Sequence, residues 1–577
     1  MEFLFLVPAR AGSKGLAEKN LRPIAGIPLV ARAVRLGRRA ISALGARARL
    51  VCSTEDERIA TTAREWGAEI PFTRPAELGR DETPSSAVVL HALGALGERW
   101  DAVVLLQPTS PLTEVEDVLG AIQLFRRTGD PVVSICETEH PVAWAMRMSE
   151  GGRLSPVVAL PRVGRRQETE TAYRPNGAVY VARPEQIRQF GGFLDDSTRG
   201  YRMPRERSVD IDSEGDLRLA DAMLAAREVA TVPIGPREIG PRKPCLVVAE
   251  AGVNHNGSLE LAHRLVDAAA DAGADAVKFQ TFITERVCAT DAPKAAYQSE
   301  TTGGGSQFEM LKRLELPYAW HGELKRHAAE RGILFLSTPD DVESARFLCD
   351  IGVPAIKVGS GELTNLPFLR ELAELGKPLL LSTGMATMAD VAHAVDATQE
   401  THRVPIALLH CVSSYPAPEE ELNLRCISSM RASFGVPVGL SDHTTSDAAA
   451  IIGMGYEMAI LEKHLTLDRA LPGPDHRMSY DPERFKELVR LVRQAGQMIG
   501  TGAKAVTPSE AATLGVVRRA LTYAATFEQG HVLRTRDLVA LRAKGGGLAP
   551  DVATRLVGRA LKRRVTSGSA VSEADVS

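Results

Sequence analysis

The sequence predicts an α/β protein in three parts: an open α/β sheet, a (β/α)8 TIM barrel and a small α+β domain. Three observations lead to this prediction. The chain has 577 residues, which is too many for one hydrophobic core. Short apolar runs alternate with longer amphipathic runs along most of it, as in parallel α/β sheets. A segment rich in proline and glycine, near residue 240, interrupts this alternation, which then restarts.

Residues 1–232 form the predicted open sheet domain. Its apolar runs are short enough for strands, and several read as buried on both faces. Amphipathic stretches such as Leu29–Ser42 and Ser86–Leu96 read as the helices between them. The predicted strands are Phe3–Val7, Ala48–Cys52, Ala102–Leu106, Val132–Ile135 and Ala178–Val181.

Residues 233–244 are the expected linker, because Val232–Pro244 contains four prolines and two glycines and has no apolar periodicity. Residues 245–505 then carry eight strand candidates separated by helical stretches, the number that a (β/α)8 barrel requires. These candidates are Leu246–Ala249, Ala276–Phe279, Leu334–Leu336, Ala355–Val358, Leu379–Leu381, Ile406–Leu409, Val438–Leu440 and Ile460–Glu462. The barrel pattern fades near Gly500, and residues 510–577 form the third predicted domain.

Composition excludes several classes of protein. The net charge of -3 provides no basic field, so nucleic acid is not an expected partner. No apolar run has transmembrane length, and Glu2 stands where a signal peptide would be basic, so we expect a cytoplasmic protein without a membrane partner. The seven cysteines are scattered and lack Cys-x-x-Cys spacing, which favours a reducing compartment over disulfides or a thiolate zinc site.

A glycine-containing loop follows the first predicted strand. Gly12 and Gly15 provide the turn, and Arg10, Lys14 and Lys19 bring three cations to one place. Backbone N–H groups in such a loop suit phosphate, and the cations suit the negative charge that builds on a departing pyrophosphate. The loop therefore predicts a nucleoside triphosphate site.

Two carboxylates near the end of the same domain indicate a metal site. Asp210 and Asp212 lie two residues apart, on one side of an extended segment. Paired carboxylates beside phosphate oxygens are a usual arrangement for Mg2+.

Residues 1–225 closely resemble the CMP-sialic acid synthetase (acylneuraminate cytidylyltransferase) family, which has a nucleotidyltransferase-type open sheet. The resemblance rests on P-A-R-x-G-S-K-G-x-x-x-K-N, R-P-A-E-L, L-Q-P-T-S-P-L, R-P-N-G-A and D-I-D. It implies catalytic roles for Arg10 and Lys19, CTP-binding roles for Gly12, Ser13, Lys14, Asn20, Arg74 and Ser85, sialate-binding roles for Gln107, Arg166 and Asn176, and Mg2+ ligation by Asp210 and Asp212.

Two positions bear on the branch of that family. Ser13 to Ala17 does not match the S-x-R-L-P loop of related Kdo cytidylyltransferases, which favours the sialate branch. After the second strand the family usually reads Ser-Thr-Asp, but this chain has Glu55 there, and we assign it no role from the sequence.

Polar side chains also follow the predicted barrel strands, at the face where barrel active sites lie. Lys278 and Lys357 suit the anionic groups of a substrate, and His443 and His464 suit a divalent metal. Carboxylates such as Glu250 can move protons.

Residues 243–505 resemble N-acetylneuraminic acid synthase, which condenses phosphoenolpyruvate with an N-acylmannosamine-type sugar. The matching runs include A-E-A-G-V-N-H-N-G-S, A-D-A-V-K-F-Q-T, I-K-V-G-S-G-E-L-T-N-L-P, G-L-S-D-H-T, E-K-H and G-P-D-H. The resemblance implies acid/base roles for Glu250 and Glu362, phosphoenolpyruvate binding by Lys278, Thr338, Lys357, Ser360 and Ser413, sugar binding by Gln280, Tyr415 and Asp475, and ligation of Mn2+ or another divalent cation by His443 and His464. Ser413 stands where the family often has Asn.

Residues 510–577 resemble the antifreeze-like (SAF) domain that ends these synthases. In the family this domain covers the barrel of a partner subunit and donates an arginine, which implies a domain-swapped homodimer or higher homo-oligomer. Arg542 matches that arginine, although Arg-Ala-Lys-Gly replaces the usual Arg-Pro-Gly.

Together the resemblances imply a bifunctional enzyme. The barrel makes N-acetylneuraminate from N-acetylmannosamine and phosphoenolpyruvate, and the N-terminal domain couples it to CTP. One alternative is the same pair of reactions on a legionaminic-acid-type sugar, from a 2,4-diacetamido-6-deoxy aldose. The other is that one half is not catalytic.

Overall fold

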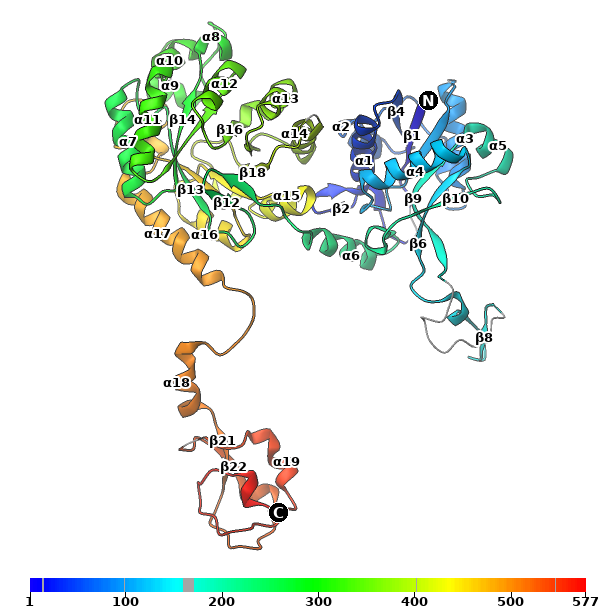
Figure 1. Ribbon diagram of the computed structural model, residues 1–577, viewed down its shortest axis with the longest axis vertical. Helices are drawn as coiled ribbons and strands as arrows, with labels where there is room; N and C mark the ends of the chain where they lie inside the picture. The colour runs from blue at the N-terminus through cyan, green and yellow to red at the C-terminus, as the bar shows by residue number, and fades with distance from the viewer. Residues whose placement is uncertain (13–14, 98, 159–170, 401, 545) are drawn as a thin grey trace. The chain divides into compact units, whose positions relative to one another are not determined.

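The computed structural model describes all 577 residues except 13–14, 98, 159–170, 401 and 545. It divides into two compact units, Met1–Met498 and Ile499–Ser577 (Figure 1). The first unit contains a six-stranded sheet and an eight-stranded sheet, each with its own helices.

The six-stranded sheet has the strand order β10-β6-β9-β5-β1-β4. Strand β9 runs antiparallel to both of its neighbours, and the other pairs are parallel, so the predicted open sheet is a mixed one. All five predicted strands are present; β10 was not predicted, because its sequence Arg-Gly-Tyr-Arg contains no apolar run. The strands are β1 (Phe3–Pro8), β4 (Ala48–Ser53), β5 (Ala102–Leu106), β6 (Val132–Glu137), β9 (Tyr173–Ala182) and β10 (Arg199–Arg202).

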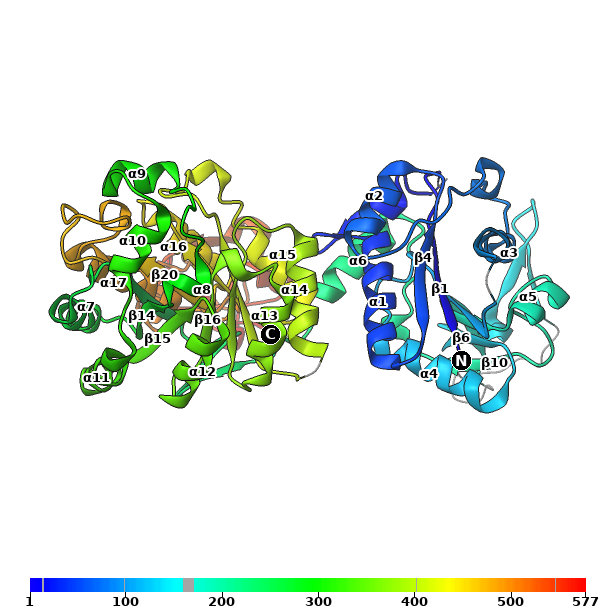
Figure 2. The same cartoon turned by 90° about the horizontal axis from the view of Figure 1, so that it is seen from above.

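Helices cover both faces of this sheet. Apolar side chains of α1, α2 and α4 share one core with the sheet, and those of α3 and α5 share another. Figure 2 shows α1 and α2 on one side of β1 and β4, with α3 and α5 on the other. The helices are α1 (Leu29–Leu44), α2 (Glu57–Glu65), α3 (Ser85–Leu96), α4 (Val115–Thr128), α5 (Pro184–Phe190) and α6 (Glu214–Ala225); β2 (Pro23–Ile24) pairs with β3 (Ile27–Pro28), and β7 (Met146–Met148) with β8 (Leu154–Pro156).

The segment expected to be a linker is an ordered hairpin. Strands β11 (Val232–Ile234) and β12 (Arg237–Ile239) pair antiparallel. Their apolar side chains belong to the same buried cluster as the barrel interior. Arg237 also forms a 2.8 Å ion pair with Asp275, which directly precedes a barrel strand. The hairpin therefore closes the amino-terminal end of the barrel, and its apolar residues are too few to show a periodicity in the sequence.

The eight-stranded sheet confirms the predicted barrel. Its strand order is β15-β14-β13-β20-β19-β18-β17-β16, each hydrogen-bonded pair is parallel, and the end strands β15 and β16 also lie in contact. Helices follow its strands, as Figure 1 shows. The strands are β13 (Leu246–Gly252), β14 (Ala276–Thr281), β15 (Leu334–Pro339), β16 (Ile356–Val358), β17 (Leu379–Ser382), β18 (Ile406–Cys411), β19 (Val438–Asp442) and β20 (Ile460–His464). The helices are α7 (Leu259–Asp271), α8 (Thr284–Val287), α9 (Ala296–Thr302), α10 (Gln307–Leu314), α11 (Tyr318–Glu330), α12 (Val342–Asp350), α13 (Leu366–Glu374), α14 (Met388–Glu400), α15 (Cys426–Phe434), α16 (Ala448–Gly455) and α17 (Pro482–Ile499).

Within the first unit, helix α1 of the sheet domain packs against α14 of the barrel. Ala389 and Ala392 of α14 belong to the apolar cluster of the sheet domain. The carboxylate of Asp396, only 6% exposed, forms ion pairs with Arg35 at 2.8 Å and Arg38 at 2.5 Å. Apolar contact and a buried charged group thus join the two domains.

The second unit has its own small core around strands β21 (Ala520–Tyr523) and β22 (Leu538–Leu541), which pair antiparallel. It also contains helices α18 (Pro508–Val517) and α19 (Ala553–Leu556). This agrees with the small α+β domain expected at the C-terminal end.

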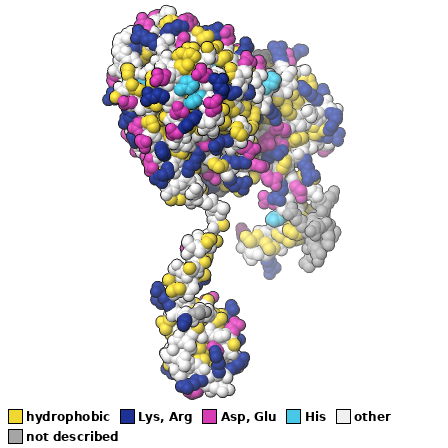
Figure 3. All heavy atoms as spheres, turned by 60° about the vertical axis from the view of Figure 1, so that its left-hand side comes forward, with side chains coloured by type: hydrophobic (Ala, Val, Ile, Leu, Met, Phe, Trp, Pro, Cys, Tyr) yellow, Lys and Arg dark blue, Asp and Glu magenta, His cyan; other side chains and the backbone are white. Residues whose placement is uncertain are grey.

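The surface shows no strong charge asymmetry on the face drawn in Figure 3, where acidic and basic side chains are interspersed. No helix in the described part of the chain is both long and apolar enough to cross a membrane.

Candidate active sites

The loop after β1 is held by side chains from elsewhere in the sheet domain. Strands β1 and β4 are parallel neighbours, so the loops that follow them meet at one edge of the sheet. Three contacts fix three successive residues of the loop: Arg74 donates to the Ala9 carbonyl at 3.0 Å, Asn20 donates to the Arg10 carbonyl at 2.9 Å, and Glu55 accepts from the Ala11 N–H at 2.8 Å.

The charged groups beneath this loop are paired. The Arg74 side chain is 3% exposed, and its Nε donates to Glu55 at 2.9 Å. Arg10 forms an ion pair with Asp81. Arg10 is therefore at the surface of the loop, whereas Arg74 supports the loop from within.

Lys19 connects the loop to the carboxylate pair. Its Nζ donates to the Ile211 carbonyl at 2.8 Å and to Asp212 at 3.0 Å. Gly15 lies against the same segment, since a Cβ there would be 2.4 Å from the Asp212 carbonyl oxygen. The structure thus brings together the predicted triphosphate loop and the predicted metal ligands.

Asp210 is suited to a metal ion. Its Oδ1 is buried and has no hydrogen-bond partner among the described residues. Burial raises its pKa above the ordinary value, and the neighbouring Asp212 raises it further, although a hydrogen bond from Thr109 opposes this shift. A divalent cation at this position would offset the cost of the buried charge. The described residues include no group of three or more potential ligands, so substrate oxygens or water would complete the coordination.

Of the predicted sugar-acid residues, Gln107 lies near Asp210. A Cβ on Gly177 would be 3.8 Å from Asp210 and 3.9 Å from Gln107, so these three residues converge. Asn176 is 1% exposed and hydrogen-bonded to Ser134 at 2.6 Å and Ser208 at 2.8 Å.

The remaining predicted residues of this site differ in how they are placed. Gly12 follows the fixed part of the loop, and a Cβ there would meet nothing within 4 Å. Ser85 is the first residue of α3. Ser13, Lys14 and Arg166 lie outside the described residues.

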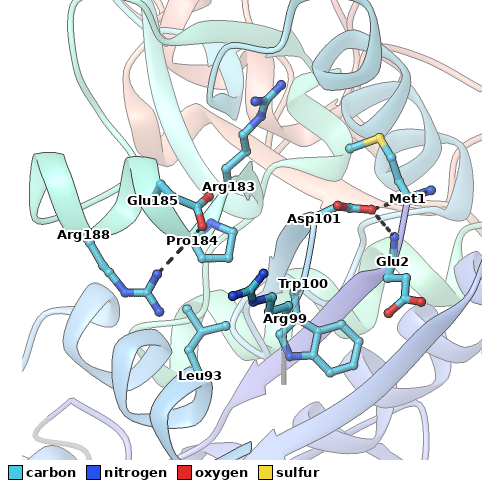
Figure 4. A pocket seen from close by; sticks show the side chains of 10 residues that line it. All are labelled: Met1, Glu2, Leu93, Arg99, Trp100, Asp101, Arg183, Pro184, Glu185 and Arg188. Atoms are coloured by element: carbon cyan, nitrogen blue, oxygen red, sulfur yellow. Dashed lines mark hydrogen bonds and ion pairs between the residues drawn. The ribbon is translucent and has the colours of Figure 1, made fainter. Parts of the chain in front are cut away.

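An open cavity of about 1040 Å³ lies in the same domain but is remote from these residues (Figure 4). It is found at the amino ends of β1 and β5, whereas ligands of such sheets bind at the carboxyl ends. None of the residues predicted for CTP, sugar acid or metal lines it. Its lining residues are Met1, Glu2, Leu93, Arg99, Trp100, Asp101, Arg183, Pro184, Glu185 and Arg188.

The barrel interior holds a buried acid and base in contact. The Nζ of Lys278 (β14) lies 2.7 Å from Glu250 (β13) and donates to Thr338 (β15) at 2.8 Å. Burial raises the pKa of Glu250 to about 7, although Lys278 opposes this shift. Glu250 can therefore hold or release a proton near neutral pH.

Glu462 is a functional candidate that the sequence did not identify. Its carboxylate lies 3.9 Å from Lys278 and 3.5 Å from Lys357, and it accepts from Ser441 at 2.9 Å. Burial opposes its ionisation, but the two lysines lower the pKa of Glu462 to about 2. The signal was available: His464 is a predicted ligand, and the two-residue period of a strand places Glu462 on the same face.

A glycine allows the predicted phosphoenolpyruvate serines to approach each other. The Gly384 N–H donates to Ser360 at 3.1 Å. A Cβ on Gly384 would be 2.1 Å from the Ser413 hydroxyl and 2.7 Å from that of Ser360. Cys411 lies 3.6 Å from Ser360 and 3.7 Å from Ser413. Only a glycine fits among these three side chains.

The predicted metal-binding histidines face each other. The rings of His443 and His464 have centroids 5.5 Å apart, and the Tyr415 ring lies 4.3 Å from that of His443. The Nδ1 of His443 lies 2.9 Å from the Val412 carbonyl, which orients the ring. The Nδ1 of His464 is buried without a partner among the described residues, and burial lowers its pKa well below the ordinary value. The contact with Cys411 raises the pKa of His443 although burial opposes this shift, so of the two rings it is His464 whose burial favours the neutral imidazole that a divalent cation requires.

The other predicted barrel residues surround these groups. Asp475 lies 4.0 Å from His464, and Gln280 donates to Glu250 at 3.5 Å. Glu362 follows β16 and accepts from Asn365 at 2.8 Å. Arg542 is an exposed residue directly after β22 of the second unit.

Comparisons with known proteins match one part of the chain to a synthase family and another part to a cytidylyltransferase family. Residues 265–504 match the NeuB family, and residues 4–147 match a cytidylyltransferase family. N,N'-diacetyllegionaminic acid synthase of Legionella pneumophila is 40% identical over 58% of this chain and 95% of its own length. The synthase of the same name from Campylobacter jejuni is 40% identical over 53% of this chain and 92% of its own. Human N-acetylneuraminate-9-phosphate synthase is 32% identical over 58% of this chain and 94% of its own.

These matches determine the reaction classes and leave the sugar open. The chain joins a cytidylyltransferase to a nonulosonic acid synthase. The relatives with the higher identity are legionaminic acid synthases, so the alternative sugar is better supported than N-acetylneuraminate.

Proposed function

The chain belongs to the NeuB family, fused to a cytidylyltransferase domain, and we propose that it makes and then activates a legionaminic-acid-type sugar. The barrel would condense phosphoenolpyruvate with a 2,4-diacetamido-6-deoxy aldose and release phosphate. The N-terminal domain would couple the resulting acid to CTP and release pyrophosphate. The product of the second half of the chain is the substrate of the first.

One observation supports the first step: two buried lysines, Lys278 and Lys357, both pair with Glu462, and Lys278 also pairs with Glu250, a buried carboxyl with a raised pKa. Lys278 and Lys357 supply positive charge for the phosphate and carboxylate of phosphoenolpyruvate, where water does not screen them. We propose that the hydroxyl groups of Thr338, Ser360 and Ser413 form hydrogen bonds with phosphoenolpyruvate.

In this reaction carbon 3 of phosphoenolpyruvate attacks the aldehyde carbon, and water then adds to the cationic carbon 2 before phosphate leaves. We assign the proton transfers to Glu250, which lies within β13, and to Glu362, which lies in the turn after β16. A divalent cation such as Mn2+ on His443 and His464 would polarise the aldehyde oxygen. We assign contacts with the aldose to Gln280, Tyr415, Asp475 and Arg542.

For the second step, the hydroxyl of the sugar acid attacks the α-phosphorus of CTP. Arg10 and Lys19 supply charge to the departing pyrophosphate, with Gly12, Ser13, Lys14, Asn20, Arg74 and Ser85 forming the CTP site. Mg2+ on Asp210 and Asp212 would neutralise phosphate oxygens. Gln107, Arg166 and Asn176 form the proposed sugar-acid side.

Mass spectrometry of the product tests the proposal. The purified chain is incubated with phosphoenolpyruvate, CTP, Mg2+, Mn2+ and either the diacetamido aldose or N-acetylmannosamine. We expect the CMP derivative of diacetyllegionaminate and at least tenfold less product from N-acetylmannosamine, because hydrogen-bonding sites reject analogues that leave their polar groups unpaired. A preference for N-acetylmannosamine would contradict the sugar assignment. A free sugar acid without CMP would contradict the second activity.

A further inference from the structure

We infer that Glu55 is a positioning residue for the CTP site, a role that rests on the proposed cytidylyl transfer. It stands two residues after β4, where its carboxylate reaches the neighbouring loop that follows β1. Oε1 accepts from the Ala11 N–H at 2.8 Å, and Oε2 accepts from the Arg74 Nε at 2.9 Å. One side chain therefore connects the triphosphate loop to a buried arginine.

Glu55 and Arg74 hold the loop from both sides of Arg10. Arg74 also donates to the Ala9 carbonyl at 3.0 Å. Arg74 therefore bonds the residue before Arg10, and Glu55 bonds the residue after it. Asn20 fixes the carbonyl of Arg10 itself at 2.9 Å. The course of the backbone through Arg10 is thereby determined by Glu55, Arg74 and Asn20.

Helix capping does not explain this carboxylate. The N-cap of α2 is Asp56, whose side chain accepts from the N–H groups of Arg58 and Ile59. The Glu55 side chain is 18% exposed, and its carboxylate forms an ion pair with Arg74 and accepts a hydrogen bond from the loop after β1. It also packs tightly, since a Cβ on Gly79 would come within 2.9 Å of its carboxyl carbon.

A carboxylate beside a triphosphate site repels the ligand unless a cation neutralises it. Arg74 provides that cation, so the Glu55–Arg74 pair adds no net charge to the site. The Ala11 N–H is already hydrogen-bonded within the protein, so it is not available to a phosphate. The loop is therefore already ordered before CTP binds, which lowers the conformational entropy that is lost on binding.

Two substitutions separate the parts of this contact. Glu55→Gln removes the charge, and its amide must turn either an N–H toward Ala11 or an N–H toward Arg74, which are both donors. Glu55→Asp keeps the charge but is one methylene shorter, so it cannot reach both partners. Glu57→Gln is the matched control, because Glu57 lies two residues away on α2, is exposed and pairs with Arg64.

Isothermal titration calorimetry of the full chain with CTP and Mg2+ measures the effect without any sugar. We expect the Kd for CTP to rise about tenfold in Glu55→Gln, the loss of one charge-assisted hydrogen bond, and by less in Glu55→Asp. The binding stoichiometry and the condensation activity of the barrel in the same chain should not change. Glu57→Gln should bind as the wild type does.

The outcomes distinguish the inference from the function. An unchanged Kd in Glu55→Gln, or a lower stoichiometry at unchanged Kd, would overturn the positioning role. A wild-type chain that does not bind CTP would overturn the proposed cytidylyl transfer, and this inference with it.

Discussion

The Nζ atom of Lys278 lies 2.7 Å from a carboxylate oxygen of Glu250, and each side chain is 3% exposed. The two residues lie opposite each other in the register of the neighbouring parallel strands β13 and β14. Burial raises the pKa of Glu250, while Glu250 and Glu462 raise that of Lys278 against the opposing effect of burial. The cation that we propose for the substrate's anionic groups and the proposed proton carrier are thus in direct contact.

Replacing Lys278 tests this arrangement. Lys278→Met removes the cation but keeps an apolar stem of similar length. We expect kcat/KM for phosphoenolpyruvate to fall by about 10²-fold or more, the effect of removing a preorganised charge from a site without water. Phosphate release measures the condensation. Cytidylyl transfer on a supplied sugar acid is the control, and its loss as well would mean that the variant is misfolded.

Gly384→Ala tests the serine cluster. The new methyl group would stand 2.1 Å from the Ser413 hydroxyl, so the serines must separate. We expect the KM for phosphoenolpyruvate to rise at least tenfold, because the phosphate contacts lose their geometry. Steady-state kinetics with varied phosphoenolpyruvate provide the measurement. An unchanged KM would show that this cluster does not bind the substrate.

Asp210→Asn tests the metal site of the cytidylyltransferase. The amide is neutral and is a weaker ligand for Mg2+ than a carboxylate. We expect CMP transfer to fall by about 10²-fold or more, since the charge on the departing pyrophosphate loses its counter-ion. A pyrophosphate assay across a Mg2+ titration provides the measurement. Condensation by the barrel should stay at the wild-type level; full CMP transfer in the variant would refute Mg2+ ligation by Asp210.

Mixing two inactive variants tests the proposed exchange of C-terminal domains. Arg542→Ala and Lys278→Met should each lack condensation activity. In a domain-swapped dimer, random pairing of the two chains restores one site in half of the dimers, which is about a quarter of the wild-type activity. Co-expression followed by a phosphate-release assay measures it. Absence of any recovery would mean that each barrel uses the Arg542 of its own chain or none.

Asp396→Asn tests the contact between α1 and α14. The substitution leaves Arg35 and Arg38 facing a neutral group, which costs about 3 kcal/mol for a buried pair. Thermal unfolding followed by calorimetry measures the loss. Glu400→Gln, at the end of the same helix, is the control, because its pair with Arg370 is exposed at 41% and 32% and contributes about 1 kcal/mol or less.

The same residue predicts an acid dependence. Burial opposes ionisation of Asp396, but Arg35, Arg38 and Arg39 lower its pKa below 3.8. The unfolded chain therefore binds this proton more readily than the folded one, so the stabilisation is complete above the unfolded pKa and is lost as the pH falls below it. The stability difference between the wild type and Asp396→Asn should shrink as the pH falls from 5 to 3. A constant difference would contradict the buried ion pair.

Most strands could be predicted because their residues face apolar surroundings on both sides. Phe3–Pro8 and the first four residues of β18, Ile406–Leu409, are continuous apolar runs, and such runs are typical of parallel strands covered by helices. Strand β10 lacks that signal, since its residues are mostly exposed. The pairing of β11 with β12 was not predicted, because prolines and glycines dominate a segment with few apolar residues.

The sequence by itself determined the two reaction classes, because a glycine-containing loop, paired carboxylates and lysines within apolar strands each stand in a short run of residues. It did not determine which of these side chains share a partner. Glu462 meets Lys278 and Lys357 because β20, β14 and β16, which are far apart in the chain, direct these side chains into the interior of one barrel. Glu55 reaches Ala11 because β4 lies beside β1, and Asp396 is buried because α14 meets α1. Each contact depends on strand order and helix packing, which only the tertiary structure decides.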